Sequence, residues 1–172
     1  MNCVKVFSGA LIVSCLFVSA GAFGQSDEMA TLKDSVGKWK AELKMFDPSG
    51  GEAGTSTGTE VNEMIGDNWL ISRFEADFQG QPFKGVGLIG YDGDAKKYIN
   101  HWVDSMGATM ANFSGTYDAK TKTMTMTGKD QMGEGKHTTL IKDAKTRVFT
   151  MYSKPDGTDD FVKVMEITYT KQ

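Results

Sequence analysis

The sequence predicts an all-β protein, an antiparallel up-and-down β-barrel of about ten strands with a short N-terminal helix. Short runs of alternating apolar and polar residues are separated by Gly, Asp, Asn and Ser, and only one stretch has helical spacing. The tripeptide Asp-Ala-Lys recurs at positions 94–96, 118–120 and 143–145, at intervals of 24 and 25 residues. Each interval accommodates two strands with their turns, and a meander this long tends to close because open edges invite aggregation.

Residues 1–24 have the pattern of a secretory leader. Lys5 is their one charge, an apolar run covers residues 6–22, and small residues end it, which predicts cleavage after Ala22 or Gly24. Two alternatives stay open, a retained membrane anchor and a lipoprotein whose cleavage box ends at Cys15. We therefore expect an exported protein, periplasmic or extracellular, in which residues 25–172 form a single domain with one core.

The charge and cysteine content of the exported chain narrow its function. Both cysteines, Cys3 and Cys15, lie in the leader, which excludes a disulfide scaffold, a Cys nucleophile and a Cys-ligated metal. Removing Lys5 leaves 18 basic and 22 acidic residues, a formal charge of −4, and the lysines are scattered, so no nucleic-acid partner is expected. No transmembrane segment is expected after cleavage, and charges on both faces of most strands exclude an outer-membrane barrel. The sequence does not fix the oligomeric state.

The elements follow in order from the turn residues. Residues 26–36 predict the helix, because Ser26 can serve as N-cap, apolar residues follow at helical spacing, and Gly37 ends it. Residues 39–46 predict the first strand, and the Pro, Gly, Ser and Thr of residues 47–58 predict a loop. The other strands are predicted at residues 59–65, 68–78, 83–91, 97–104, 108–117, 122–128, 136–142, 146–153 and 161–170.

The stretch of residues 85–106, which holds most of a predicted hairpin, carries the most distinctive residues of the chain. The side chains of its first strand alternate between two faces with a period of two. Residues 92–96 are typical of a turn, because Gly93 can take a positive φ and lies between aspartates. The return strand has apolar and polar residues on both sides, for example Asn100 and Trp102 against His101 and Val103. A strand packed only on a dry core would not have this pattern.

The connections sort into two ends of the barrel. The three Asp-Ala-Lys turns fall at one end, which we expect to be tight and closed by the N-terminal helix. The other connections are mostly longer and richer in Gly, so that end is expected to be the mouth. They are residues 47–58, 79–81, 105–107, 129–135 and 154–160.

Two resemblances support this architecture. Gly37-Lys38-Trp39, between a helix and the first strand of a meander, resembles the Gly-x-Trp signature of the lipocalin and fatty-acid-binding superfamily. In that superfamily a basic residue near the last strand packs over the Trp, and the resemblance implies this place for Lys171.

A broader match is to the bacterial family known as domain of unknown function 1579. The chain is similar to it over nearly all of the exported part, and the resemblance implies a lipocalin-like fold with no established activity. The matching motifs are Gly54-Thr55-Ser56-Thr57-Gly58, Trp69-Leu70-Ile71-Ser72-Arg73-Phe74, Gly90-Tyr91-Asp92, Trp102-Val103-Asp104-Ser105-Met106, Gly115-Thr116-Tyr117-Asp118 and Met165-Glu166-Ile167-Thr168-Tyr169.

Several motifs match known sites only formally. The glycines of residues 85–90 satisfy the dinucleotide fingerprint, but a turn and a strand follow where a helix is needed, so we interpret them as strand bends and expect no cofactor. A triad of His101, Asp104 and Ser105 fails because four residues of a strand span roughly 13 Å. The two histidines, His101 and His137, lie on separate predicted strands, so no metal is expected.

The candidate ligand-binding residues combine charged, aromatic and thioether side chains in the middle of strands. They are Arg73, Phe74, Tyr91, His101, Trp102, Asp104, Met106 and Glu166. Arg73 and Glu166 are expected to face the cavity, as an ion pair or with Arg73 holding an anionic head group, because an unpaired buried charge costs several kcal/mol. The alternative is that both point to water.

Methionines are frequent on and near the predicted strands, and their flexible thioethers suit an irregular apolar guest or simply fill a core. The set is Met106, Met110, Met124, Met126, Met132, Met151 and Met165.

Three functions fit these observations. The first is binding of a small hydrophobic or amphipathic molecule inside the barrel. The second is an enzyme that uses Tyr91, His101, Asp104 and Glu166 at the mouth as acid and base, although no residue can be named catalytic. The third is a non-catalytic envelope protein that binds a partner and has a filled interior.

Overall fold

The computed structural model describes residues 27–78, 80–131, 133–155 and 157–172. The predicted leader, the alternatives that depend on it and the predicted N-cap Ser26 lie outside the described residues. Among the helices that the structure describes, none is long and apolar enough to cross a membrane.

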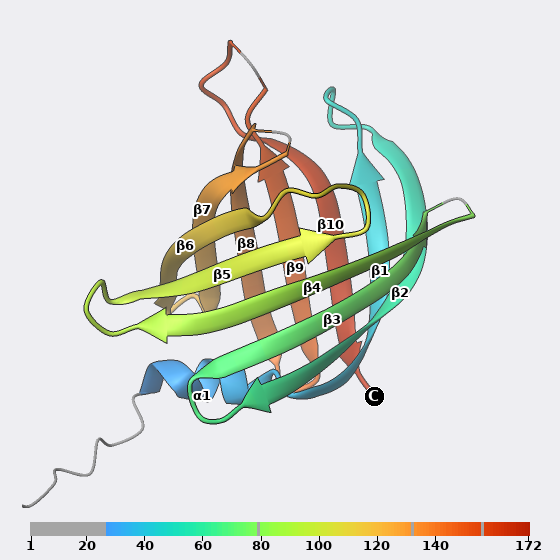
Figure 1. Cartoon of the computed structure of the whole chain (residues 1–172). Coiled ribbons are helices and arrows are strands. Elements are labelled where there is room, and N and C mark those ends of the chain that lie inside the picture. The colour runs from blue at the N-terminus through green and yellow to red at the C-terminus, as the bar shows by residue number, and fades with distance from the viewer. Residues whose placement is uncertain (1–26, 79, 132, 156) are drawn as a thin grey trace, which may run out of the picture.

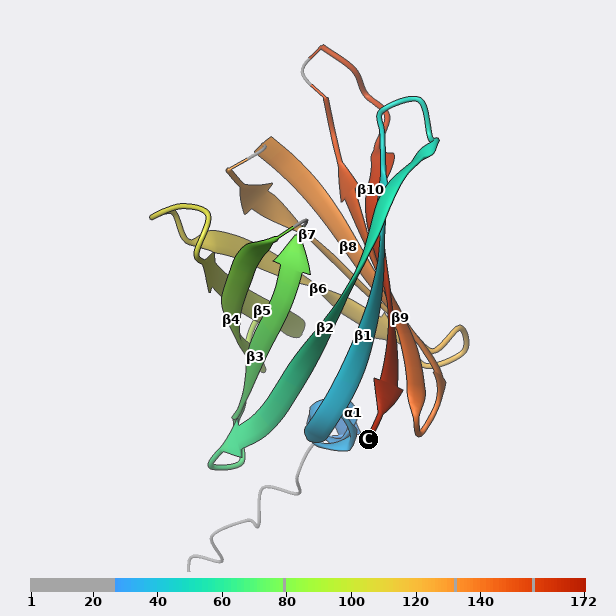
Figure 2. The same ribbon diagram turned by 90° about the vertical axis from the view of Figure 1, so that its right-hand side faces the viewer.

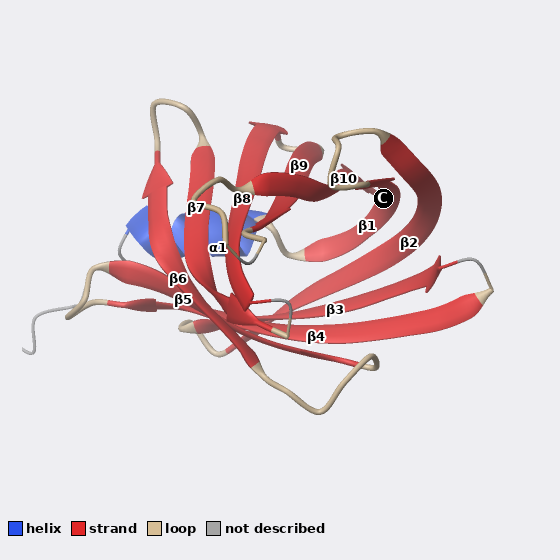
Figure 3. Ribbon diagram, turned by 90° about the horizontal axis from the view of Figure 1, so that it is seen from above, coloured by secondary structure: helices blue, strands red, loops and turns tan. Residues whose placement is uncertain are grey.

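Ten antiparallel strands close into a barrel in which neighbours in sequence are neighbours in space, and β1 pairs with β10 to complete the circle (Figures 1 and 3). This confirms the predicted all-β, up-and-down architecture. In chain order the elements are α1 (Asp27–Asp34), β1 (Gly37–Phe46), β2 (Glu52–Ile65), β3 (Trp69–Phe78), β4 (Gln81–Asp92), β5 (Lys97–Asp104), β6 (Ala111–Asp118), β7 (Thr123–Asp130), β8 (Gly133–Asp143), β9 (Thr146–Ser153) and β10 (Val162–Lys171).

Strand alternation builds the inner face. On β1 the buried residues Trp39, Ala41 and Leu43 alternate with exposed charged residues, as a strand with one face on a core requires. The inward residues gather in two clusters. One lies against α1 and includes Leu70 and Phe113, and the other surrounds Trp39 and Tyr169.

The helix closes one end of the barrel. Met29 and Leu32 of α1 are buried in the cluster that contains Leu70 and Tyr98, and the Tyr98 hydroxyl donates a hydrogen bond of 2.7 Å to the Glu28 carbonyl. Figure 2 shows α1 at the foot of the strands, with the long connections at the opposite end. The prediction that the helix closes the tight end is confirmed.

The three tight turns share one feature, an aspartate whose carboxylate accepts a hydrogen bond from the turn backbone. Asp92, Asp118 and Asp143 end β4, β6 and β8, and each accepts a hydrogen bond of 2.8–3.0 Å from a backbone N–H two residues later. Such Asx turns fix the chain reversal locally. In the second and third turns this aspartate is the first residue of the Asp-Ala-Lys repeat. In the first turn it is Asp92, two positions before the Asp94 that begins the repeat there.

The predicted loop at residues 47–58 is largely wrong. Only residues 47–51 connect β1 to β2, because β2 begins at Glu52 and pairs with β1 along its length. Backbone ladder bonds form whatever the side chains, and Thr and Ser tolerate strand geometry. Gly58 lets β3 approach β2 closely on the other side, since a Cβ there would lie 2.5 Å from the Glu75 carbonyl oxygen of β3. The predicted start of the sixth strand, residue 108, also moves, to Ala111.

Candidate functional site

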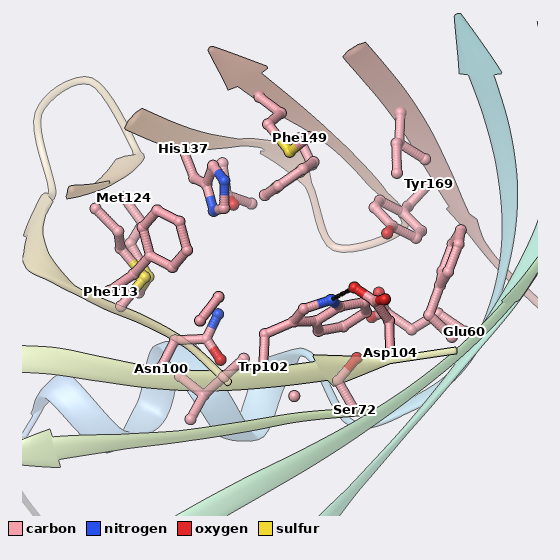
Figure 4. A pocket seen from close by; sticks show the side chains of 18 of the residues that line it. Glu60, Ser72, Asn100, Trp102, Asp104, Phe113, Met124, His137, Phe149 and Tyr169 are labelled. Carbon is pink, nitrogen blue, oxygen red and sulfur yellow. Dashed lines mark hydrogen bonds between the residues drawn. The ribbon is translucent and has the colours of Figure 1, made fainter. Parts of the chain in front are cut away.

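A cavity of about 470 Å³ occupies the barrel interior. Its described lining comes from α1, from β2 to β10 and from the connections at residues 105–110 and 131, so the cavity runs from the helix to the long-loop end. Aromatic, aliphatic and thioether side chains dominate it, among them Phe74. Figure 4 shows two others, Phe113 and Phe149. This is the composition of a small-molecule pocket, with a few polar groups placed among apolar ones.

Four of the residues expected from the sequence line this cavity. Phe74 is 4% exposed, and Trp102, Asp104 and Met106 lie toward the mouth. The Trp102 Nε1 donates to Asp104 Oδ2 at 2.9 Å, and the Met106 backbone N–H donates to Asp104 Oδ1 at 2.9 Å. Both carboxylate oxygens are thus engaged, and Oδ2 fixes the orientation of the indole ring.

Arg73 does not face the cavity, so that prediction is wrong. On β3 the buried residues Leu70, Ser72 and Phe74 point inward, and the alternation places Arg73 on the outer face, where it is exposed. Glu166 also lies outside the cavity lining, and its carboxylate is 3.4 Å from Lys163 Nζ. The expected pairing of Arg73 with Glu166 is therefore not formed.

The expected acid and base residues do not assemble either. His101 lies on the outer face, where its Nδ1 is 2.6 Å from Asn112 Oδ1. Tyr91 packs at the helix end with its ring 5.2 Å from that of Tyr98, and burial and the nearby Glu28 carboxylate raise the pKa of its phenol. Asp104 alone of this grouping lines the cavity, so the geometry lacks the predicted acid–base constellation.

An ion pair inside the barrel was not predicted from the sequence. Arg147 of β9 and Glu60 of β2 form a buried salt bridge between Nη2 and Oε1, and Asn62 Nδ2 donates to Glu60 Oε1 at 2.6 Å. Asn62 Nδ2 also donates to the Ser35 carbonyl at 3.0 Å, and the same carbonyl accepts from Trp39 Nε1 at 2.9 Å. These contacts connect Arg147, Glu60 and Asn62, which form the floor of the cavity at its helix end, to the residue that follows α1.

Aromatic rings complete the surroundings of Arg147. Its guanidinium carbon lies 4.3 Å from the centroid of a Trp39 ring and 4.6 Å from that of Tyr169, within range of cation–π attraction. Burial and the Glu60 carboxylate raise the pKa of Tyr169 well above its ordinary value. Lys171 also lies over Trp39, with Nζ 5.2 Å from the centroid, as the resemblance implied. Arg147 is a second basic residue in that position.

His137 is a titratable ring in the cavity lining, on β8 beside the strand that carries Arg147. It stacks on Phe113 with centroids 3.9 Å apart and meets Phe149 edge-on at 5.2 Å. Burial lowers the pKa of His137 from 6.5 to about 4, so the imidazole is neutral at pH 7.

Methionines surround the remaining space. Those in the described lining are Met106, Met124, Met126, Met151 and Met165. Met110 instead lines a shallow groove on the outer face beside His101, and Met132 lies outside the described residues. Among described side chains no group of three or more His, Cys, Asp or Glu lies close enough to hold a metal ion.

Comparisons with known proteins identify the family and the fold of this chain and say little about its chemistry. The family described as “Protein of unknown function (DUF1579)” matches residues 25–171. No curated protein matches the chain. The crystal structure of Rv2717c from M. tuberculosis has a TM-score of 0.65 at 11% identity, covering 86% of this chain and 98% of that one. This likeness shows the fold alone.

Two further solved structures are similar at lower scores. A redesigned β-barrel, b11L5F_LGL, has a TM-score of 0.42 at 13% identity, covering 83% of this chain and 95% of that one. The structure titled EF1p2_mFAP2b bound to DFHBI has a TM-score of 0.45 at 9% identity, covering 84% and 98%.

Proposed function

The chain belongs to the DUF1579 family, and from the interior of its barrel we propose that it binds a small apolar or amphipathic molecule. The observation that carries the proposal is the cavity of about 470 Å³ with its apolar lining. Pockets for small molecules typically measure about 300–1,000 Å³.

An empty space of this size is unusual in a protein core. Protein interiors are packed as densely as organic crystals, and voids larger than one water molecule are few. At about 30 Å³ for each water, the cavity of about 470 Å³ has room for roughly fifteen. Water there would find few polar partners, so an apolar guest would gain both dispersion contacts and burial.

We also propose that the protein acts outside the cytoplasm, after export and cleavage within residues 22–25. The support is the leader pattern of residues 1–24 and the absence of cysteine from residues 25–172. Cell fractionation followed by mass measurement of the purified chain tests this. A chain that keeps residues 1–24, or one found in the cytoplasm, would contradict it.

Titration with a neutral solvatochromic dye tests the binding function. Nile red should become fluorescent in the presence of residues 25–172 and should be displaced by apolar competitors. Thr139 and Thr138 of β8 provide a matched pair of variants, because Thr139 lines the cavity and Thr138, the preceding residue, has the opposite orientation.

Thr139→Phe should fill part of the cavity and weaken dye binding at least tenfold, whereas Thr138→Phe should leave it unchanged. Equal affinity in the two variants would place the dye outside the barrel and refute the proposal. Native mass spectrometry of protein purified from its host complements the titration, because a retained small molecule would identify the class of guest.

A further inference from the structure

The floor of the cavity holds the one basic side chain of the described lining. The charged residues of that lining are Glu60, Asp104, Asp130 and Arg147, a formal charge of −2. His137 adds no charge at pH 7, because burial lowers its pKa to about 4. An arginine is a favoured partner of a carboxylate, since its guanidinium can donate two parallel hydrogen bonds to the two oxygens. Whether the barrel accepts an anionic ligand therefore depends on Arg147.

Arg147 is already occupied by a partner from the protein itself. Its Nη2 donates to Glu60 Oε1, and its guanidinium carbon lies 4.3 Å from the centroid of a Trp39 ring and 4.6 Å from that of Tyr169. Arg147 and Glu60 are only 9% and 8% exposed. The two charges are thus shielded from water, so their attraction is weakened much less than that of a surface ion pair.

Glu60 is also held from a second side. Asn62 lies two residues further along β2, on the same face of the strand, and its Nδ2 donates to Glu60 Oε1 at 2.6 Å. The same Nδ2 donates to the Ser35 carbonyl at 3.0 Å, which fixes Asn62 to the chain that follows α1. Turning Glu60 away from Arg147 would break the hydrogen bond with Asn62 as well. The Glu60 carboxylate therefore stays where the carboxylate of a ligand would bind.

A ligand carboxylate would enter a site that already has its anion. If it bound Arg147 beside Glu60, one guanidinium would face two buried negative charges. If it displaced Glu60, that carboxylate would be left buried without a partner. Both arrangements are strongly unfavourable away from water, and an uncharged ligand meets neither penalty.

A cationic ligand finds no better partner among these groups. Asp104 Oδ2 accepts from Trp102 Nε1 and Asp104 Oδ1 accepts from the Met106 backbone N–H, both at 2.9 Å. Glu60 is bound by Arg147. These charges thus have partners within the protein, and most of the described lining is apolar, so an uncharged molecule fits the cavity best.

We propose that the ligand of this barrel is an uncharged, largely apolar molecule, and that Glu60 excludes carboxylates from the cavity by occupying Arg147. The inference rests on the proposed binding function and specifies the chemistry of its ligand. Glu60 acts through Arg147. Without the charge of Glu60, the guanidinium would be a buried cation that attracts the carboxylate of a ligand.

Probes with different head groups test the exclusion in the wild-type protein. Decanoate and decanamide have the same alkyl chain and nearly the same size, and at about pH 8 they differ by one charge. Decanamide should displace Nile red at a concentration at least about tenfold lower than decanoate. Decylammonium, whose head group is protonated at this pH, should also be weaker than decanamide. Equal or stronger displacement by decanoate or by decylammonium would overturn the uncharged ligand.

Variants assign the exclusion to Glu60. Glu60→Gln keeps the size of the side chain and removes its charge, so the concentration of decanoate that displaces Nile red should fall at least about tenfold, while that of decanamide changes less than about threefold. Glu63→Gln is the matched control, because it makes the same substitution on β2 at an exposed position on the outer face and should leave both probes unchanged. Adding Arg147→Met to Glu60→Gln should abolish the gain for decanoate.

Urea denaturation supplies a second readout. Glu60→Gln leaves Arg147 buried without an anion, so decanoate should stabilise this variant more than decanamide does, whereas decanamide should be the better stabiliser of the wild type. If the variant does not fold alone, the comparison is made during refolding, and recovery only with decanoate is expected. Recovery that does not depend on decanoate, or no recovery, would overturn the role of Glu60.

The outcomes distinguish this inference from the proposed function. The same affinity for decanoate in the wild type, Glu60→Gln and Glu63→Gln would overturn the role of Glu60 and leave a cavity that binds apolar molecules. Absence of Nile red binding, with no retained molecule in native mass spectra, would instead remove the binding function itself.

Discussion

Acidification should destabilise this barrel through one buried imidazole. His137 stacks on Phe113 and contacts Phe149, and its Nε2 has no protein partner. Protonation would place a positive charge in a buried site, with no carboxylate bonded to it in the described structure. The folded state therefore resists a proton that the unfolded chain accepts readily.

The sign and size follow from the two pKa values. Burial lowers the pKa of His137 from 6.5 in the unfolded chain to about 4 in the folded one. The stabilisation is complete above pH 6.5 and is lost as the pH falls toward 4, because in that window only the unfolded state binds the proton. Between pH 7.5 and 4.5 the loss amounts to about 2–3 kcal/mol in the free energy of unfolding.

Urea denaturation at a series of pH values measures this loss. The variant His137→Phe keeps an aromatic ring beside Phe113 and cannot titrate at this position, whereas every other residue is the same in the two proteins. The wild-type protein should therefore lose about 2–3 kcal/mol more than the variant between pH 7.5 and 4.5. Parallel pH profiles would refute the reasoning and place His137 in contact with water in the folded state.

The other predictions concern the floor of the cavity and the wall beside Trp102. Arg147→Met should lower the free energy of unfolding, measured by urea denaturation, by about 3–5 kcal/mol, because it leaves the Glu60 carboxylate buried without its partner. Adding Glu60→Gln should recover much of this loss. A double variant as unstable as the single one would contradict this prediction. Gly85→Ala should shift tryptophan fluorescence and cost about 1–3 kcal/mol, since a Cβ would lie 2.1 Å from the Trp102 ring. Gly93→Ala, with open space around it, is the control and should stay within about 0.5 kcal/mol.

The fold could be predicted because its signals are local. Period-two alternation and turn residues mark each strand, and a meander leaves little choice of neighbours once the strands are known. The aspartates that bond their own turns are equally local, which is why the repeat located the tight end. The start of β2 was missed because Glu52 to Gly58 pair through the backbone, without the apolar pattern that identifies a strand.

The orientation of Arg73 could not be predicted from its apolar neighbours. In a closed barrel the outer face also carries apolar residues, and Arg73 pairs laterally with Val61 and Val86 on that face. The informative signal was parity: Phe74 is the adjacent residue, and a strand cannot turn two consecutive side chains inward. The placement of Phe74 on the inner face would by itself have excluded Arg73.

The ion pair of Arg147 with Glu60 depends on how the barrel closes, and not on the pairing of neighbouring strands. β9 and β2 are separated by β10 and β1 in the barrel order, so the contact spans the interior and no strand register specifies it. One signal did exist in the sequence. The resemblance at Trp39 called for a basic residue over the indole, and Arg147 meets that requirement from β9 as Lys171 does from β10.

The arrangement of the core explains why a guest would be favoured. The inward side chains form two clusters, one against α1 and one around Trp39, and Trp102 packs against both. The cavity borders both clusters, since its lining includes Leu70 and Phe113 from the first and Phe74 and Ile167 from the second. A bound apolar molecule would contact both clusters across the cavity. Its binding would raise the free energy of unfolding by RT ln(1 + [L]/Kd), where [L] is the concentration of free ligand and Kd its dissociation constant. Under the proposed function the barrel without ligand would be the less stable form, and the contacts that the cavity lining lacks would give a ligand its affinity.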